Sequence, residues 1–516
     1  LMSTLFELQE SGDSMQKPAA KQLIEFVHQA LVLSIRYDAV IANPPYMGSN
    51  GMNAELKDFS KKNFPNSKSD LFAIFMERAF KLLSQYGFNA QINMQSWMFL
   101  SSYEQLRSNL LEDHTFITMA HLGARAFSQI SGEVVQTTAW VIQKEHIKQY
   151  QPSFYRLVEG NEQEKQDALL NRENEFSATV QEDFEKIAGN PIAYWVSKEL
   201  RYTFGKFNSF SHFSDTRIGL ITGDNNRYIR QWHEITHAKL GLNFTRDSSK
   251  NSGCKWFPQS KGGEFRKWYG NNDTVVDWSN DGFELQTRMH DSGTRTLAHN
   301  FNLDKIFDPA ITWTKISGGS FSARYQPMGF LFNDASANAF PKNEDDCWVL
   351  LAFLASKLPV EMLKAVNPTL NFLPGNISIL PISNEIMTSE GIKNRTKKLV
   401  EMAKVDWDSQ ETSWDFCKLN WGIISDTPSL LRESYNSQRK KWSEYSSEVQ
   451  QLEQDNNKEL ISAYGLDAEI TPLVPLSEIT LMCNPYYRYG NNRTDDELEL
   501  MLRCDKTREL VSYSLG

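Results

Sequence analysis

Two short stretches of this 516-residue chain carry side chains whose types and spacing could do chemistry. The first is Asn43-Pro44-Pro45-Tyr46, which follows an apolar run over 37–42. Two successive prolines cannot continue a strand or a helix, so the chain must turn there. The second stretch, His233-Glu234-Ile235-Thr236-His237, has the histidine spacing of a zinc site on a helix, with Glu234 as a general base.

The first stretch suits an exocyclic amino group on a flat ring. The Asn43 amide oxygen and the Pro44 carbonyl are two acceptors, and Pro45 restricts the residue before it. Hydrogen bonds from the amine protons to these acceptors would free the nitrogen lone pair, and Tyr46 would stack on the ring. Acceptors set in place beforehand stabilise the charge that develops on nitrogen. An adenine in a duplex would have to flip out to reach them. The alternative interpretation is a strand that ends in a proline turn.

Strands and helices that alternate over residues 1–150 are expected to position this corner. The apolar run 37–42 predicts a strand buried in a parallel sheet, and ligands bind at the carboxyl edge of such sheets. A helix is predicted after Ser69, which would be its N-cap, with Gly87 as its stop. Further strands are predicted over 88–94, 116–123 and 132–144, with a helix over 102–113. The pattern is that of an α/β layer.

Three further regions differ from the first in composition. Residues 151–205 are polar and charged, and predict a linker or an exposed helix. Residues 206–390 are rich in Gly, Asn, Ser, Trp and Tyr, and predict short segments that are mostly β or irregular. Residues 391–516 predict a helical region that includes one long charged helix.

Composition restricts the class of protein but not its activity. The chain is 40% hydrophobic and 23% charged, with a mean hydropathy of -0.49, as in ordinary folded proteins. It shows no apolar window long enough for a membrane span and no signal peptide. Five scattered cysteines without CxxC spacing indicate neither a disulfide framework nor a cysteine zinc site. They fit a reducing cytoplasm, which is the expected location. The net charge of -10 argues only weakly against nucleic acid, because local patches decide binding.

The sequence around the corner resembles a known family. Asn43-Pro44-Pro45-Tyr46 is similar to the NPPY motif of adenine-N6 DNA methyltransferases. The stretches "VIANPPYMGSN", "SKSDLFAIFMERAF", "MAHLGARAF" and "KELISAYGLDAEITPLVPLSEITL" resemble PglX, the family of large methyltransferases of BREX phage-defence systems. The resemblance covers nearly the whole chain. It implies a partial class I, Rossmann-like methyltransferase sheet over 1–150. A mixed α+β target-recognition domain would follow over 206–390, with a C-terminal helical segment.

The resemblance also implies roles for particular residues. Asn43, Pro44, Pro45 and Tyr46 would hold the target adenine. S-adenosylmethionine would be the cofactor, without a metal, and double-stranded DNA and other BREX proteins would be the partners.

The family lines its cofactor pocket where Asp70 and Phe72 fall in this sequence, although a helix cap and a core ring are equally good interpretations. Thr137 or Trp140 falls where related enzymes place residues beside the flipped base, and core packing is the preferred alternative. The glycine-rich cofactor loop of these enzymes does not precede Asn43. We therefore expect a middle-to-C-terminal piece of such an enzyme, with an incomplete cofactor site.

The implied recognition domain contains clusters of residue types that bind DNA. Arg and Lys contact phosphates or guanine edges, and small residues allow close approach. The candidates are Arg227, Tyr228, Arg230, Lys261, Arg266, Lys267, Ser320, Arg324 and Tyr325. For any single one of them, a solvated charge or an ordinary loop residue is the competing interpretation.

Two other classes of function stay open on the sequence. A non-catalytic DNA-binding specificity subunit would fit the missing cofactor loop. A zinc hydrolase would use His233 and His237, but it needs a third ligand, and only the distant Glu264 offers one. A chance match is the preferred account of that motif.

Overall fold

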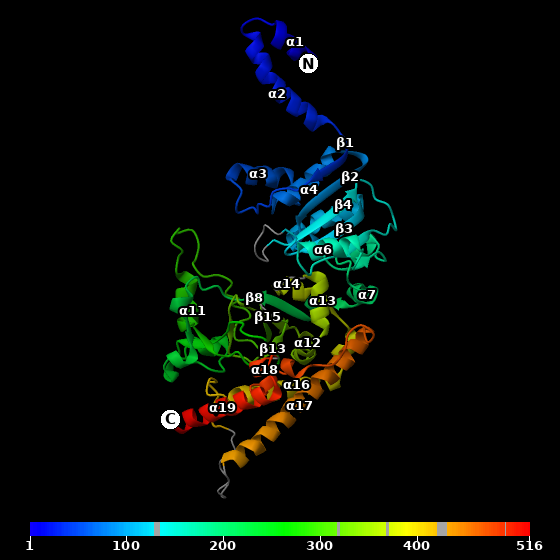
Figure 1. Ribbon diagram of the computed structural model, residues 1–516. Helices are drawn as coiled ribbons and strands as arrows, with labels where there is room; N and C mark the ends of the chain where they lie inside the picture. The colour runs from blue at the N-terminus through cyan, green and yellow to red at the C-terminus, as the bar shows by residue number, and fades with distance from the viewer. Residues whose placement is uncertain (128–134, 317–319, 368–370, 420–430, 491, 516) are drawn as a thin grey trace. The chain divides into compact units, whose positions relative to one another are not determined.

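The computed structural model describes residues 1–127, 135–316, 320–367, 371–419, 431–490 and 492–515. The chain divides into two compact units, Leu1–Ser197 and Lys198–Gly516 (Figure 1). In the first unit, the described residues include a six-stranded mixed sheet in the order β1-β2-β4-β3-β5-β6. Its strands are β1 (Tyr37–Ala42), β2 (Leu83–Met94), β3 (Thr115–Gly123), β4 (Thr137–Gln143), β5 (Ser153–Arg156) and β6 (Glu175–Phe176).

Strand directions in this sheet are mixed. β1 pairs in parallel with β2, and β3 pairs in parallel with β5. β4 lies between β2 and β3 and runs antiparallel to both. The helices of this unit are α1 (Met2–Ser11), α2 (Gln16–Ser34), α3 (Ala54–Asn63), α4 (Leu71–Leu82), α5 (Glu104–Asp113) and α6 (Glu162–Leu170). The 3-10 turns are η1 (Gln95–Met98), η2 (Ser101–Tyr103) and η3 (Gln181–Lys186). The mixed α/β class expected for the chain is confirmed.

Helix α4 fixes the region that carries the candidate corner. It buries Phe72, Ala73 and Met76 completely, in a core that includes Trp97 and Trp140. The predicted helix is present but shorter, because Asp70 rather than Ser69 caps it and it ends at Leu82, before Gly87. The carboxylate of Asp70 caps by accepting from the Phe72 N–H.

The region expected as a linker over 151–205 is largely structured. β5 pairs with β3, and β6 pairs with β5, so both extend the central sheet. The first compact unit accordingly continues to Ser197. Charged residues of this segment lie on α6, where Lys165 is buried and donates to the backbone carbonyls of Leu122 and Leu157. The sequence shows the charge but not these long-range pairings.

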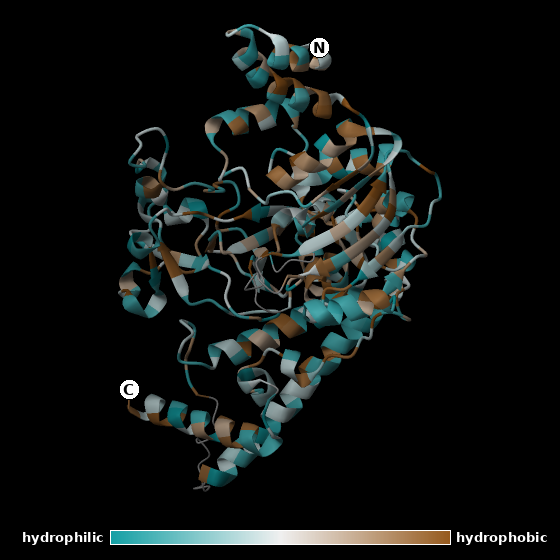
Figure 2. Ribbon diagram, turned by 45° about the horizontal axis from the view of Figure 1, so that its top comes forward, coloured by the Kyte–Doolittle hydropathy of each residue, from teal (hydrophilic) through white to brown (hydrophobic). Residues whose placement is uncertain are grey.

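Apolar side chains stay in solvent at one edge of this unit. β1 is an outer strand of the described sheet, and Ile41 on it is 81% exposed. Helix α2 buries Ala20 but leaves Phe26 and Leu33 more than half exposed, and Figure 2 shows further apolar residues along it. Exposed strand edges and apolar patches of this kind are typical of surfaces that another segment covers.

The second unit contains two four-stranded sheets and a small pair of strands. The sheet orders are β14-β10-β11-β9 and β13-β12-β15-β8, and β16 pairs with β7. The strands are β7 (Asn208–Ser209), β8 (Ser214–Ile218), β9 (Ile229–Gln231), β10 (Trp256–Ser260), β11 (Thr274–Asp277), β12 (Ala310–Thr314), β13 (Ala323–Gln326), β14 (Leu331–Phe332), β15 (Ser336–Pro341) and β16 (Pro381–Ile382). The short strands and irregular segments predicted over 206–390 are present, but helices alternate with them, which the composition did not indicate. A core that includes Trp278, Phe257 and Phe332 lies beneath them.

Helices flank these sheets and dominate the last third of the chain. Those before residue 380 are α7 (Lys198–Lys206), α8 (Phe210–Phe213), α9 (Asn225–Tyr228), α10 (Arg246–Ser249), α11 (Ser279–Thr287), α12 (Asp346–Ala355), α13 (Leu358–Val366) and α14 (Pro374–Ser378). The remainder are α15 (Asn384–Met387), α16 (Glu390–Asp408), α17 (Leu431–Tyr464), α18 (Pro485–Tyr489) and α19 (Asp495–Leu515), and 3-10 turns fall at η4 (Trp232–Glu234), η5 (His237–Lys239) and η6 (Leu476–Glu478). Among the described residues, no helix has the length and apolar character of a membrane span.

Candidate active site and DNA-binding surface

The Asn43–Tyr46 corner lies at the carboxyl end of β1. The last residue pair of the β1–β2 ladder is Ala42 with Gln91, and Asn43 follows directly. Asn43 and Pro45 are exposed, Pro44 is buried, and Tyr46 is half-buried. The asparagine therefore faces solvent at the sheet edge where an α/β ligand site is expected.

Both proposed acceptors are available. Within the described residues, no group donates a hydrogen bond to the Asn43 side chain or to the Pro44 carbonyl. The ring of Tyr46 meets Phe72 edge-on, with centroids 6.2 Å apart, so the core supports it from one side. Burial raises the pKa of Tyr46, which keeps its hydroxyl neutral. The corner thus offers two oxygen acceptors and a supported aromatic ring.

The two residues expected in the cofactor pocket have structural partners. Asp70 Oδ1 accepts from the backbone N–H of Phe72 at 3.3 Å and of Met47 at 3.0 Å. Phe72 is fully buried and also packs against Tyr103, at 5.8 Å between ring centroids. Asp70 is therefore a helix cap and Phe72 is a core ring, as the alternative interpretations proposed.

A buried polar cluster around Asn93, which the sequence motifs do not indicate, lies at the same edge of the sheet. Because β4 runs antiparallel to β2, its first residue, Thr137, pairs with Met94 at the end of β2. The Asn93 side-chain oxygen accepts from the indole N–H groups of Trp97 at 3.2 Å and Trp140 at 3.1 Å. Thr137 and Trp140 are both buried, so core packing, the preferred alternative, describes them. Polar Asn93 at a buried strand position was the signal available in the sequence.

His121 completes this cluster and stays neutral. Its Nε2 lies 2.6 Å from Gln95 Oε1, and Gln95 in turn donates to Gln136. Burial, helped by the charges of Arg156 and Lys165, lowers the pKa of His121 from 6.5 to about 3. The imidazole is therefore a fixed hydrogen-bonding group and not a proton carrier near neutral pH.

This buried imidazole predicts a pH dependence of stability. Between pH 6.5 and about 3 the unfolded histidine binds a proton that the folded one does not, so the free energy of unfolding falls as the pH is lowered. The same holds for His114, whose pKa burial lowers to about 4. Urea unfolding at pH 7 and pH 5 measures the slope. The His121→Gln variant is expected to flatten it, and an unchanged slope in that variant would contradict the assignment.

Four of the nine candidate DNA contacts are buried. Tyr228 and Arg324 are 1% exposed, and Arg266 and Lys267 are 5% exposed. Arg266 lies over the ring of Trp407 at 4.8 Å, and Lys267 forms an ion pair with Glu453. Their burial and these contacts favour structural roles for the four side chains over the predicted contact with DNA.

The other five candidates lie nearer the surface. Arg227 is exposed and paired with Glu284, and Arg230 donates to the backbone carbonyls of Asn226 and Ile229. Tyr325 packs against Trp348 with centroids 5.1 Å apart. Lys261 and Ser320 are exposed, and Lys261 lines a cavity of about 600 Å³ together with Gln231, Asn271 and Gln410.

The structure removes the geometric basis of the zinc interpretation. His233 lies in η4, Ile235 is extended, and His237 begins a separate 3-10 turn. The two imidazoles therefore do not share one face of a helix, which the zinc motif requires. No cluster of three or more potential metal ligands occurs among the residues described.

A polar hairpin over 288–299 projects beside the loop 222–227. Ile221, directly before that loop, forms paired backbone hydrogen bonds of 3.0 Å with His299 at the end of the hairpin. Residues 291–295 at the tip are exposed. Arg295 there has no ion pair within the described chain. A two-stranded ribbon of this kind has the dimensions that the major groove of DNA admits.

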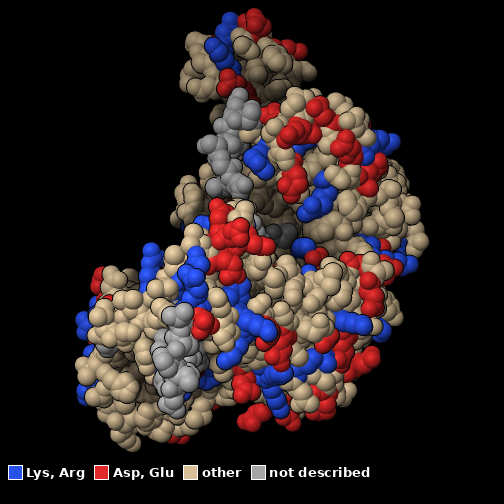
Figure 3. Space-filling view, turned by 60° about the horizontal axis from the view of Figure 1, so that its bottom comes forward, with Lys and Arg blue, Asp and Glu red and all other residues tan. Residues whose placement is uncertain are grey.

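Charge on the surface is mixed. In Figure 3, basic and acidic side chains are interspersed over the face in view and do not form one broad basic surface. On this face, binding to nucleic acid would depend on local groups and not on a broad basic surface.

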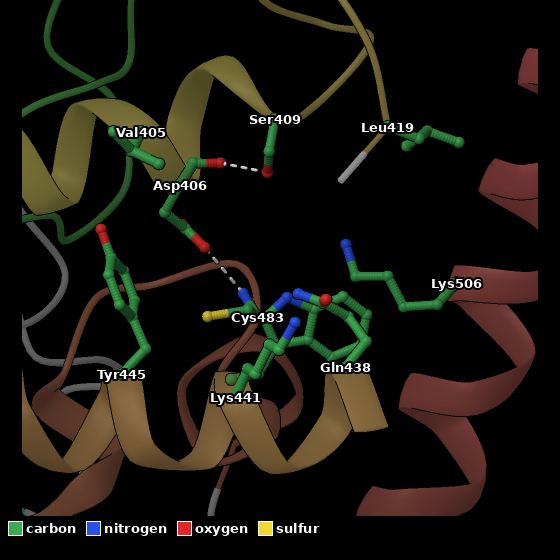
Figure 4. A pocket seen from close by; sticks show the side chains of 10 residues that line it. Val405, Asp406, Ser409, Leu419, Gln438, Lys441, Tyr445, Cys483 and Lys506 are labelled. Atoms are coloured by element: carbon green, nitrogen blue, oxygen red, sulfur yellow. Dashed lines mark hydrogen bonds between the residues drawn. The ribbon is translucent and has the colours of Figure 1, made fainter. Parts of the chain in front are cut away.

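A separate cavity of about 140 Å³ lies among α16, α17 and α19 (Figure 4). Its buried Asp406 accepts from the backbone N–H groups of Met482 at 2.5 Å and Cys483 at 3.0 Å. Lys506 donates to Glu509 at 2.7 Å and lies over Trp442. These charged groups thus have structural partners, and we assign the cavity no function.

The chain is similar in sequence to two proteins that are named adenine-specific methyltransferases. The chain is 43% identical, over 520 residues, to the adenine-specific methyltransferase BrxX of Escherichia coli O9:H4 (strain HS), across 100% of this chain and 41% of that protein. It is 36% identical, over 470 residues, to the adenine-specific methyltransferase PglX of Lacticaseibacillus casei (strain Zhang), across 87% of this chain and 38% of that protein. This chain is PglX-like. The resemblance on which the sequence analysis relied is therefore confirmed.

Two further comparisons concern parts of this PglX-like chain and its fold. Residues 5–127, which include the Asn43–Tyr46 corner, match the family of Eco57I restriction-modification methylases. Among solved structures, the type IIL restriction-modification enzyme MmeI in complex with DNA aligns with 86% of this chain and 56% of its own, at 12% identity and a TM-score of 0.48. The chain spans about two fifths of the length of the two curated relatives.

Proposed function

We propose that the protein containing this chain methylates the N6 amine of adenine at a specific site in double-stranded DNA. The observation that carries the proposal is the corner itself. Asn43 is exposed at the end of a parallel-paired strand, beside the supported ring of Tyr46 and the Pro44 carbonyl, to which no described residue donates a hydrogen bond. Both curated relatives are named adenine-specific methyltransferases. By the same likeness we propose a role in BREX defence with other BREX proteins as partners.

The chain's own groups act on the flipped adenine. The Asn43 amide oxygen and the Pro44 carbonyl accept hydrogen bonds from the two N6–H groups, which localises the nitrogen lone pair for attack. After methyl transfer the cationic nitrogen releases one of its protons to solvent. Tyr46 stacks on the base and holds its plane. These acceptors are set by the proline corner before the base arrives, so little reorganisation is needed as positive charge develops on nitrogen.

S-adenosylmethionine would supply the methyl group, as a sulfonium with a good leaving group. The residues of this chain do not by themselves fit a complete site for it. Asp70 already accepts two backbone hydrogen bonds, and Phe72 is fully buried. We therefore assign the corner to the adenine side of the reaction.

The direct test uses the full-length protein, S-adenosylmethionine with a labelled methyl group, and unmodified DNA. N6-methyladenine at one recurring sequence, found by sequencing the product, is the expected result. DNA binding without methyl transfer would instead favour the non-catalytic specificity subunit and overturn the proposal.

We also propose that the 288–299 hairpin contacts the duplex. Replacing Arg295 with alanine is expected to weaken binding by about 1–3 kcal/mol, roughly 5- to 160-fold, because its guanidinium would no longer read a guanine edge. Fluorescence anisotropy at constant salt, with the duplex that the protein methylates, measures the effect. Lys440→Ala is the control, because Lys440 on α17 is also highly exposed. Equal affinities for the Arg295→Ala variant and the control would remove the hairpin from the interface.

A further inference from the structure

The loop that follows the candidate corner is fastened to the start of α4. The Leu71 N–H donates to the Met47 carbonyl at 3.0 Å, and the Ser49 N–H donates to the Ser69 carbonyl at 2.9 Å. Met47 directly follows Tyr46, so these bonds act one residue away from the proposed base contacts.

Asp70 contributes the side-chain bond of this junction. Its Oδ1 accepts from the Met47 N–H at 3.0 Å while also capping α4 through the Phe72 N–H at 3.3 Å. One carboxylate oxygen therefore joins the corner to a helix N-terminus, where negative charge is favoured. Hydrogen bonds to a charged acceptor are stronger than those between neutral groups.

Helix α4 is a rigid base for such a bond. Phe72, Ala73 and Met76 are fully buried, so the first turns of the helix cannot shift without disturbing the core. Phe72 also supports the Tyr46 ring, which means that the backbone and the ring of the corner are held by adjacent residues of one helix.

We propose that Asp70 is a positioning residue for the adenine-methylating corner: its carboxylate fixes the Met47 backbone and thereby the placement of Asn43, Pro44 and Tyr46. This inference rests on the proposed function. It differs from the cofactor-binding role that the resemblance implies for Asp70, because the carboxylate acts through backbone N–H groups of the chain itself. Misplacement of reacting groups by about 1 Å can cost on the order of 100-fold in rate.

Three variants of the full-length protein test the role. Asp70→Ala removes both hydrogen bonds, and we expect kcat for adenine methylation to fall about 10- to 100-fold. Asp70→Asn keeps a side-chain oxygen that can accept hydrogen bonds from both N–H groups. We therefore expect kcat within about 3-fold of the original. The dissociation constant for S-adenosylmethionine should change less than about 2-fold in both, since neither bond involves the cofactor.

Asn161→Ala is the matched control. Asn161 is the N-cap of α6 in the same unit, with its side chain accepting from the Glu164 N–H at 3.1 Å, but it has no bond to the corner. We expect it to lower thermal stability as Asp70→Ala does while leaving kcat near the original. Equal losses of kcat in the two variants would show that Asp70 only stabilises the helix as a cap, and would contradict the positioning role. A loss confined to S-adenosylmethionine affinity would restore the cofactor role and overturn the proposal.

Hydrogen exchange separates this inference from the proposed function. The Met47 amide should exchange faster in Asp70→Ala than in Asp70→Asn, whether or not the protein methylates DNA. An inactive original protein would refute the proposed function alone. Unchanged exchange at Met47 in Asp70→Ala would refute the junction itself.

Discussion

Replacing Asn43 with alanine in the full-length protein is expected to slow adenine methylation by at least about 100-fold. The alanine removes one of two acceptors for the N6 protons, so the lone pair of the amine stays delocalised in the ring. Asn43 is exposed and makes no hydrogen bond within the described chain, so its loss should not unfold the protein. Single-turnover incorporation of labelled methyl groups into DNA measures the effect on the chemical step.

Affinity for DNA should stay close to the original in Asn43→Ala, because we propose that groups other than Asn43, such as the 288–299 hairpin, contact the duplex. Asn50→Ala is the control: Asn50 is also an exposed asparagine, seven positions further along the same loop. It is expected to retain activity. Adenine methylation that persists at the original rate in Asn43→Ala would rule out the corner as the site of chemistry.

Replacing Lys267 with methionine is expected to destabilise the second unit by about 3–5 kcal/mol. Lys267 and Glu453 form an ion pair with side chains 6% and 3% exposed, and Glu453 also accepts from the Trp268 indole at 2.7 Å. Burial raises the pKa of Glu453, and the Lys267 charge opposes that shift. Without the ammonium group, the carboxylate is left buried with no opposite charge.

Urea unfolding followed by tryptophan fluorescence measures this loss. The double variant Lys267→Met with Glu453→Met should recover much of it, because apolar side chains can replace a buried ion pair. Lys440→Met removes an ammonium that is 80% exposed and should change stability little. If Lys267→Met were as mild as Lys440→Met, the pair would not be structural and a DNA-contact role for Lys267 would return.

Individual strands and helices such as β1 and α4 could largely be predicted, because the residue pattern that indicates each of them lies within the element itself. The apolar run before Asn43 forms β1, and α4 follows from apolar residues at helical spacing. The predicted burial of that strand is wrong, because β1 is an outer strand of the described sheet and Ile41 on it is 81% exposed. The cap was misassigned because Ser69 and Asp70 are adjacent and both can cap. Asp70 takes the role because its carboxylate reaches the Phe72 N–H and the Met47 N–H together.

The roles of basic residues in the second unit were harder to predict, because residue type does not reveal burial. Arg266, Lys267 and Arg324 have the composition of a DNA contact, yet each lies inside the second unit. Burial lowers the pKa of Arg324 to about 10, which reflects its distance from water. Glu453 lies 186 positions after Lys267, so no local pattern could have shown the pair.

By itself, the sequence determined the chemistry of the corner: which residues follow β1, that two prolines must turn the chain there, and that an amide, a carbonyl and a phenol ring lie within four positions. These are properties of neighbouring residues and need no fold. Only the tertiary structure decided that Asn43 stays in solvent, that Asp70 fastens the corner to α4, and that several basic residues turn inward. Those outcomes depend on contacts between segments far apart in the chain, where burial and hydrogen bonding are settled by packing and not by local propensity.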